Sequence, residues 1–203
     1  CVTSPRDIDA AIAAAVTPGV TVATYGDLIR VPGSHDSLER ARARGADIRV
    51  VYSAMDALAI AMQQPARQVI LLGIGFETTA PTVAASILEA SRRSLKNYRV
   101  LSHLKLTPPV MRALLARGET RIDGIVCPGH VSVIIGMEPY QFIPGEYGVA
   151  CAVSGFEPLD ILGAVDLLVQ QVENGAPVVA NAYSRAVAQG GNQTARRLVE
   201  DVF

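Results

Sequence analysis

Two short motifs place a carboxylate where a buried, strand-like run gives way to a helix. They are Gly75-Phe76-Glu77-Thr78-Thr79 and, eighty residues on, Gly155-Phe156-Glu157. In each motif Gly permits a tight backbone path, Phe can cover the edge of the core, and Glu is carried beyond it. We therefore expect exposed carboxylates at the mouth of a ligand crevice. A structural alternative is also open, in which Glu77 favours a helix dipole and Thr78 or Thr79 caps the helix.

Histidine and serine follow another predicted strand, in Pro128-Gly129-His130 and at Ser132. An imidazole at a strand end can transfer protons or bind a metal, and it can equally be an ordinary hydrogen-bonded side chain. We expect His103, inside an apolar run, to be structural. His35 lies between two small polar residues and is expected to be solvated.

The three cysteines differ in their surroundings. Cys151 lies in an apolar run and is expected to be a buried small hydrophobe, whereas Cys127 could line the core or the crevice. Cys1 precedes a capped helix by three residues, where the helix dipole can lower the pKa of a thiol and raise its reactivity. No Cys-x-x-Cys or Cys/His metal spacing is complete, so the residues themselves predict no metal site.

Strands and helices must alternate to position these residues. Helix starts are marked by two capping boxes and by proline in first turns, at Ser4 with Asp7, Ser53 with Asp56, Thr107 with Pro108, and Pro158. Continuous apolar runs predict strands buried on both faces, at 20–26, 47–53, 67–74, 98–104, 123–128, 148–154 and 177–183. Their spacing is typical of βαβ units, so we expect a doubly wound α/β fold with mostly parallel sheets.

The two Gly-Phe-Glu motifs form a weak internal repeat, and two Pro-Gly segments form another. We therefore expect two similar α/β half-domains facing one another, 1–120 and 121–203. In open α/β sheets the ligand crevice lies at the carboxyl ends of the strands. Four polar, glycine-bearing loops fall there, at 31–37, 75–79, 127–132 and 154–158. None matches a dinucleotide-binding Gly-x-Gly-x-x-Gly pattern or a P-loop.

Composition excludes several classes of protein. Of 203 residues, 50% are apolar and 18% are charged, and the formal net charge is −1. These values are typical of a globular protein and give no electrostatic reason to expect a nucleic-acid or membrane partner. Three dispersed cysteines do not form a disulfide framework and fit a reducing, cytoplasmic setting. Because the chain opens on Cys1 and ends in a helical pattern, we expect it to be an internal piece of a longer protein.

Read together, the motifs resemble the HypD family of nickel-iron hydrogenase maturation factors. The likeness rests on "GFETTAPT", "CPGHVSVIIG" and "GFEPLDIL", in this order and spacing. The connecting segments "YGDLIRVPGS", "ARARGADIRVVYSAMDAL" and "LTPPVMRALL" resemble the same family. Practically the whole chain is covered.

The resemblance implies a maturation factor with a redox role rather than an ordinary metabolic enzyme. HypD proteins form, with HypC, a scaffold on which an iron centre with two cyanides and one carbon monoxide, Fe(CN)2CO, is assembled, and HypE delivers the cyanides. The resemblance also implies two Rossmann-like lobes around a cleft, with a further domain that carries a [4Fe-4S] cluster. Cys1 resembles the second thiol of the family's redox pair, and Glu77 with its threonines and His130 with Ser132 resemble its cleft motifs. On this basis Cys1, Glu77 and His130 are expected to open onto one cleft.

The chain also departs from the family pattern. The first thiol of the pair, the upstream Cys-Gly-Thr-His motif and the cluster cysteines are missing, so no iron or iron-sulfur cluster is expected in this fragment. Ala182 stands where the family's Asn-Gln-Tyr-Ser-Arg motif has an amide. The alternative function is a small-molecule-binding α/β enzyme that uses the same strand-end cleft. The flanking sequence distinguishes the two.

Overall fold

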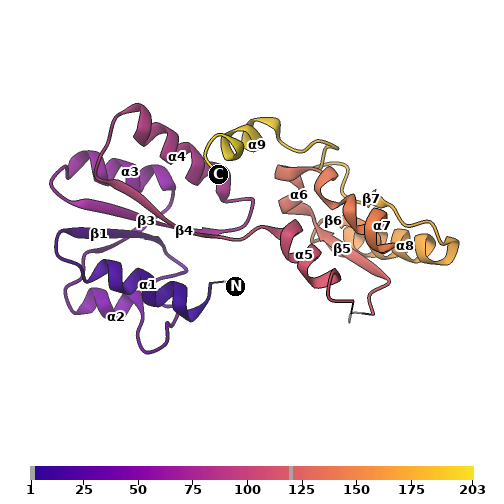
Figure 1. Ribbon diagram of the computed structural model, residues 1–203, viewed down its shortest axis with the longest axis horizontal. Helices are drawn as coiled ribbons and strands as arrows, with labels where there is room; N and C mark the ends of the chain where they lie inside the picture. The colour runs from indigo at the N-terminus through magenta and orange to yellow at the C-terminus, as the bar shows by residue number, and fades with distance from the viewer. Residues whose placement is uncertain (1–2, 119–120) are drawn as a thin grey trace. The chain divides into compact units, whose positions relative to one another are not determined.

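The computed structural model describes residues 3–118 and 121–203 and alternates strands with helices (Figure 1). The strands are β1 (Val20–Tyr25), β2 (Ile48–Val51), β3 (Gln68–Gly75), β4 (Tyr98–Leu104), β5 (Gly124–Pro128), β6 (Ala150–Ser154) and β7 (Val179–Asn181). The helices are α1 (Pro5–Ala15), α2 (Leu38–Ala43), α3 (Ala54–Gln63), α4 (Ala80–Arg92), α5 (Thr107–Leu115), α6 (Gly129–Ile135), α7 (Phe142–Tyr147), α8 (Pro158–Asn174) and α9 (Gln193–Glu200), with a short 3₁₀ helix η1 (Glu138–Tyr140). The predicted α/β class is confirmed.

The described chain forms two compact units, each built on its own parallel sheet. The first unit comprises 1–75, 79–105 and 198–203, with strand order β2-β1-β3-β4. The second comprises 76–78 and 106–197, with strand order β5-β6-β7. Residues 76–78 therefore group with the second unit, although Gly75 before them and Thr79 after them belong to the first. The lobe boundary expected near residue 120 stays a prediction.

The sheet of the first unit is covered by helices on both faces, with α1 and α2 on one and α3 and α4 on the other (Figure 1). Successive residues of β1 serve the two faces, because Val22 packs with the α1 and α2 cluster and Ala23 with the α3 cluster. Both residues are fully buried. This explains why the central strands read as continuous apolar runs.

Local signals fix the helix starts of the first unit. Ser4 and Asp7 form a complete capping box at α1, and Ser53 and Asp56 form another at α3. Each box satisfies backbone N–H groups that the first helical turn leaves without partners. The sequence predictions for both helix starts are confirmed.

The core of the second unit surrounds β6, every residue of which is buried. Cys127, Cys151 and Val153 form a cluster there with Tyr140 and Ile143. Both cysteines are fully buried, which confirms the expectation for Cys151 and assigns Cys127 to the core. The hydrogen bond with Cys151, followed by burial, raises the pKa of the Cys127 thiol. These two thiols are therefore inert packing groups.

We expect Cys127 and Cys151 to resist alkylation as long as the second unit is folded, because both side chains are fully buried and reagent has no access to them. Iodoacetamide labelling, read by mass spectrometry of tryptic peptides, should modify neither residue in native buffer and both in denaturing guanidinium chloride. Rapid native labelling of either thiol would contradict their placement in the core.

Candidate functional site: the carboxyl edge of the second sheet

Three loops meet where β5, β6 and β7 end, and their close packing requires two glycines. A side chain at Gly129 would place its Cβ 2.2 Å from the carbonyl oxygen of Ser154 and 2.8 Å from the Tyr183 ring. A Cβ at Gly155 would lie 2.1 Å from the Asp160 carboxylate and 2.8 Å from the same ring. Such distances exclude any larger residue unless the backbone moves. The two sequence-predicted glycines thus position these loops around Tyr183.

An exposed aromatic pair lies at this edge. The rings of His130 and Phe156 pack edge to face, with centroids 4.6 Å apart. Phe156 is 67% exposed and His130 is exposed as well. The expectation that Phe covers the edge of the core does not hold for Phe156, because its ring packs on the imidazole and faces solvent. An exposed apolar ring beside an imidazole offers contact area and a proton donor or acceptor to a bound partner.

An arginine that sequence reasoning missed organises the acidic side of the edge. The Arg185 guanidinium donates to both carboxylate oxygens of Asp160, at 2.5 and 2.7 Å, and to Glu157 at 3.3 Å. It also lies 4.6 Å from the centre of the Tyr183 ring. The hydrogen bond from Arg185 is the main reason that the pKa of Asp160 is lowered. Glu157 is mostly exposed, as expected for a carboxylate at the edge.

The sequence signal for this network is the spacing of Glu157 and Asp160, which places one carboxylate at the N-cap position and the other in the first turn of α8. The loop after β7 is held by a different amide from the one that the family motif suggested. Asn181 donates to the carbonyl of Val187 and accepts from the N–H of Tyr183. Ala182 contributes only its backbone N–H, to Val153.

Glu77 is not the exposed carboxylate that was expected. Glu77 is only 5% exposed. One of its carboxylate oxygens accepts a hydrogen bond from the backbone N–H of Thr107 at 2.5 Å, and the other accepts from the Thr107 hydroxyl at 3.0 Å. Thr107 is the first residue of α5, whose N-cap residue, Leu106, makes no side-chain cap. Glu77 therefore caps a helix that begins thirty residues later in the chain. A carboxylate is favoured there by the unpaired N–H groups and the helix dipole.

The two predicted motifs lie close to one another through Tyr140. Burial raises the pKa of Tyr140, and the nearby Cys127, Glu77 and Cys151 add to that rise. Ser132 donates to the carbonyl of Pro128 at 2.8 Å and contacts the Tyr140 hydroxyl at 3.4 Å. Ser132 is fully buried, so its hydroxyl fixes the start of α6. Glu77 and Ser132 thus support the edge from inside.

The remaining residues of the first motif shape a turn. Gly75 has a φ of 134°, and a Cβ there would lie 2.4 Å from the Thr79 hydroxyl. Thr79 occupies the N-cap position of α4, but its side chain makes no capping hydrogen bond. Thr78 is exposed and Phe76 is half-buried. Cys1, and with it the expected cleft shared by Cys1, Glu77 and His130, lies outside the described residues.

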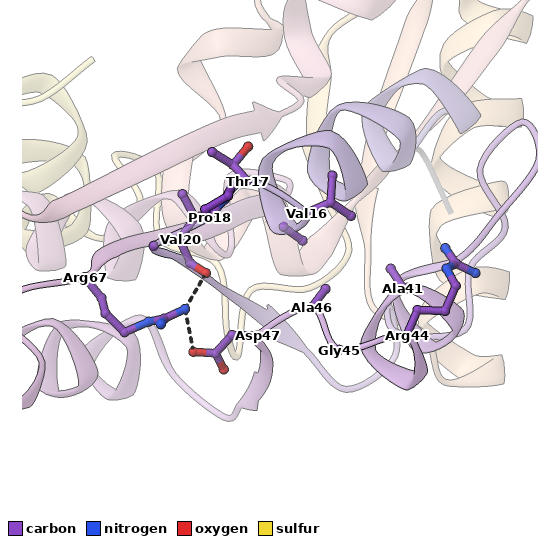
Figure 2. A pocket seen from close by; sticks show the side chains of 12 residues that line it. Val16, Thr17, Pro18, Val20, Ala41, Arg44, Gly45, Ala46, Asp47 and Arg67 are labelled. Atoms are coloured by element: carbon purple, nitrogen blue, oxygen red, sulfur yellow. Dashed lines mark hydrogen bonds and ion pairs between the residues drawn. The ribbon is translucent and has the colours of Figure 1, made fainter.

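A hollow of about 270 Å³ occurs at the amino ends of the first sheet's strands (Figure 2). Arg67 donates there to the carbonyl of Val20 and to the hydroxyl of Thr21, and pairs with Asp47 at 3.3 Å. These bonds tie the ends of three strands together, and ligands of open α/β sheets bind at the other edge. We regard this hollow as structural. Within 3–118 and 121–203, no three His, Cys, Asp or Glu side chains gather as metal ligands.

Replacing Glu77 by alanine should destabilise α5, because two hydrogen bonds at its first turn are lost, at a cost of about 1–3 kcal/mol. Glu77→Gln keeps an acceptor oxygen and should cost less. Thermal unfolding and amide hydrogen exchange over the first turn of α5 measure both effects. Glu173→Ala, which removes an exposed carboxylate from α8, is the control. Equal stability of Glu77→Ala and this control would refute the capping role.

The Arg185–Asp160 pair should make stability depend on acid pH. Because the folded-state pKa of Asp160 is lowered, its contribution is present above the unfolded-state value of about 3.9 and is lost as pH falls below it. The stability gap between wild type and Asp160→Asn should therefore be widest near neutral pH and should close toward pH 3. Urea unfolding midpoints measured against pH test this. Asp166→Asn, on the same helix, should leave the acid profile unchanged.

Comparison with known proteins identifies the family to which the chain belongs. The profile of a family described as "HypD: Hydrogenase formation hypA family" matches residues 1–203. The chain is 44% identical over 204 residues to the hydrogenase maturation factor HypD of Escherichia coli (strain K12), and covers 54% of that protein. Identity to the HypD of Rhodobacter capsulatus is 43% over 203 residues, and to that of Rhizobium leguminosarum bv. viciae 46% over 210, again covering 54% of each. All of this chain is aligned in each case, so the chain spans about half the length of these relatives and belongs to the HypD family.

Proposed function

We propose that the full-length protein acts in maturation of nickel-iron hydrogenase, as a scaffold on which the Fe(CN)2CO centre is assembled. Family membership over the whole chain supports this role, because relatives that are 43–46% identical are named hydrogenase maturation factors. HypC and HypE are the proposed protein partners, and the iron centre is the cargo. The proposed location is the cytoplasm. In the described part of the chain, no helix is long and apolar enough to cross a membrane.

The observation that carries the proposal is the carboxyl edge of the second sheet. Three family motifs contribute to it or support it, and its outer side chains are His130, Phe156 and Glu157. Arg185 and Asp160 hold the acidic side in place through a bidentate ion pair. Such an edge offers an apolar ring, an imidazole and a carboxylate to one partner, and its rigid support keeps them in position. We propose that it receives a partner protein or the cargo that the partner carries.

Thiol redox chemistry is proposed for Cys1, with iron and a [4Fe-4S] cluster in the full-length protein. The described residues do not fit a cluster, since Cys127 and Cys151 are buried in a packed core. We propose that other parts of the full-length protein supply the cluster ligands.

The edge is tested by substituting His130 in the full-length protein. His130→Ala should reduce hydrogenase activity in cells at least about tenfold while leaving thermal unfolding nearly unchanged, because exposed side chains contribute little stability. Gln170→Ala, exposed near the far end of α8, is the matched control and should mature hydrogenase normally. Wild-type hydrogenase activity in the His130→Ala strain would overturn the proposed role of this edge.

A further inference from the structure

Helix α8 carries an apolar stripe that the described residues leave exposed. Its members recur about once per turn along one side of the helix, and each is 43–65% exposed: Ile161, Leu162, Val165, Val169 and Val172. Other residues of α8 face the sheet, among them Ala164, which is fully buried, and Gln171, which donates to the carbonyl of Cys151. The stripe is therefore a second apolar side, separate from the one that packs on the sheet. A contiguous exposed patch of this kind marks an interaction surface in a soluble protein.

The face of the second sheet on which α8 packs is also incompletely covered at β5. A Cβ at Gly124 would lie 3.2 Å from the Leu168 side chain, so Gly124 faces α8. Side chains alternate along a strand, and Val126 therefore faces the same way, yet it is 45% exposed. Helices α6 and α7 pack on the opposite face, with Cys127. Among the described strands β5 pairs with β6 alone, so the exposed valine lies on an edge strand.

The charges beside the stripe do not favour a second copy of this chain as the group that covers it. Asp166 and Glu173 are exposed, and each lies four residues after a member of the stripe, which makes them its neighbours on the helix surface. Helix α8 contains no Lys, Arg or His. The α8 helix of a second copy would bring only further carboxylates to this position, and like charges in contact are unfavourable.

The full-length protein has further chain with which to cover the stripe. The described chain covers 54% of each of three relatives, so nearly half of their length lies outside the aligned part. A segment of the same chain packs there without the entropic cost of bringing two molecules together. We propose that the part of the full-length protein outside residues 1–203 supplies an amphipathic helix that packs along the α8 stripe and over Val126. The first unit has the corresponding arrangement, since two helices cover each face of its sheet.

Site-specific photo-cross-linking in the full-length protein tests this cover. Irradiation of the Leu162→p-benzoylphenylalanine variant should give a product of single-chain mass, and mass spectrometry should find the link to a peptide from outside residues 1–203. Gln170→p-benzoylphenylalanine carries the same probe on the polar side of α8 and is the matched control, which should give no such link. A product of twice the chain mass, a link within residues 1–203, or no link from position 162 would each overturn the proposal.

A measurement on the wild-type full-length protein covers the case in which the probe disturbs the packing. Hydroxyl radicals should oxidise Leu162 and Val169 about tenfold more slowly in the native than in the unfolded protein, because a packed helix excludes solvent from both side chains. Leu162 is 65% exposed when α8 lacks this neighbour, so an uncovered stripe predicts little slowing. Nearly equal native and unfolded rates at both positions would contradict the cover. Neither readout involves hydrogenase maturation, so this proposal and the proposed function can fail separately.

Discussion

The constraint on which the second unit depends is that helix α5 begins without a cap of its own. Its first N–H groups must find an acceptor, and Leu106 supplies none from its side chain. The carboxylate of Glu77 meets this need from another part of the chain and is buried in doing so. The residue is therefore both a structural cap and a charge held near Tyr140, where it helps to keep the phenol neutral. The acid group of the first motif acts inside the unit rather than at its surface.

The other residues of the site connect this buried interior to the exposed edge of the second sheet. Ser132 anchors α6 to the end of β5, Gly129 and Gly155 let two loops close on Tyr183, and Arg185 fixes the carboxylates beyond them. Only the outermost side chains are left for a partner. A site built in this way is rigid where it meets the protein and open where it meets solvent.

The sequence predicted much of this architecture because its signals are local. Capping boxes, proline in first turns and apolar runs located the strands and several helices, and these were confirmed. Helix α7 was missed, since it is short and contains Pro144 and Gly145, which normally break helices. The burial of Glu77 was missed for a different reason. Its partner is thirty residues away, and no local pattern reports such a contact. Arg185 escaped notice because its carboxylate partners lie about 25 residues before it.

The loop after β7 has a consequence for how this family's sequences can diverge. Asn181 makes the side-chain hydrogen bonds that hold the loop, whereas Ala182 joins the sheet through its backbone alone. An amide lost at position 182 therefore removes no bond on which the loop's shape depends. Position 182 is free to vary under selection for other properties, such as the fit of a particular partner. Asn181, one residue earlier, has no such freedom.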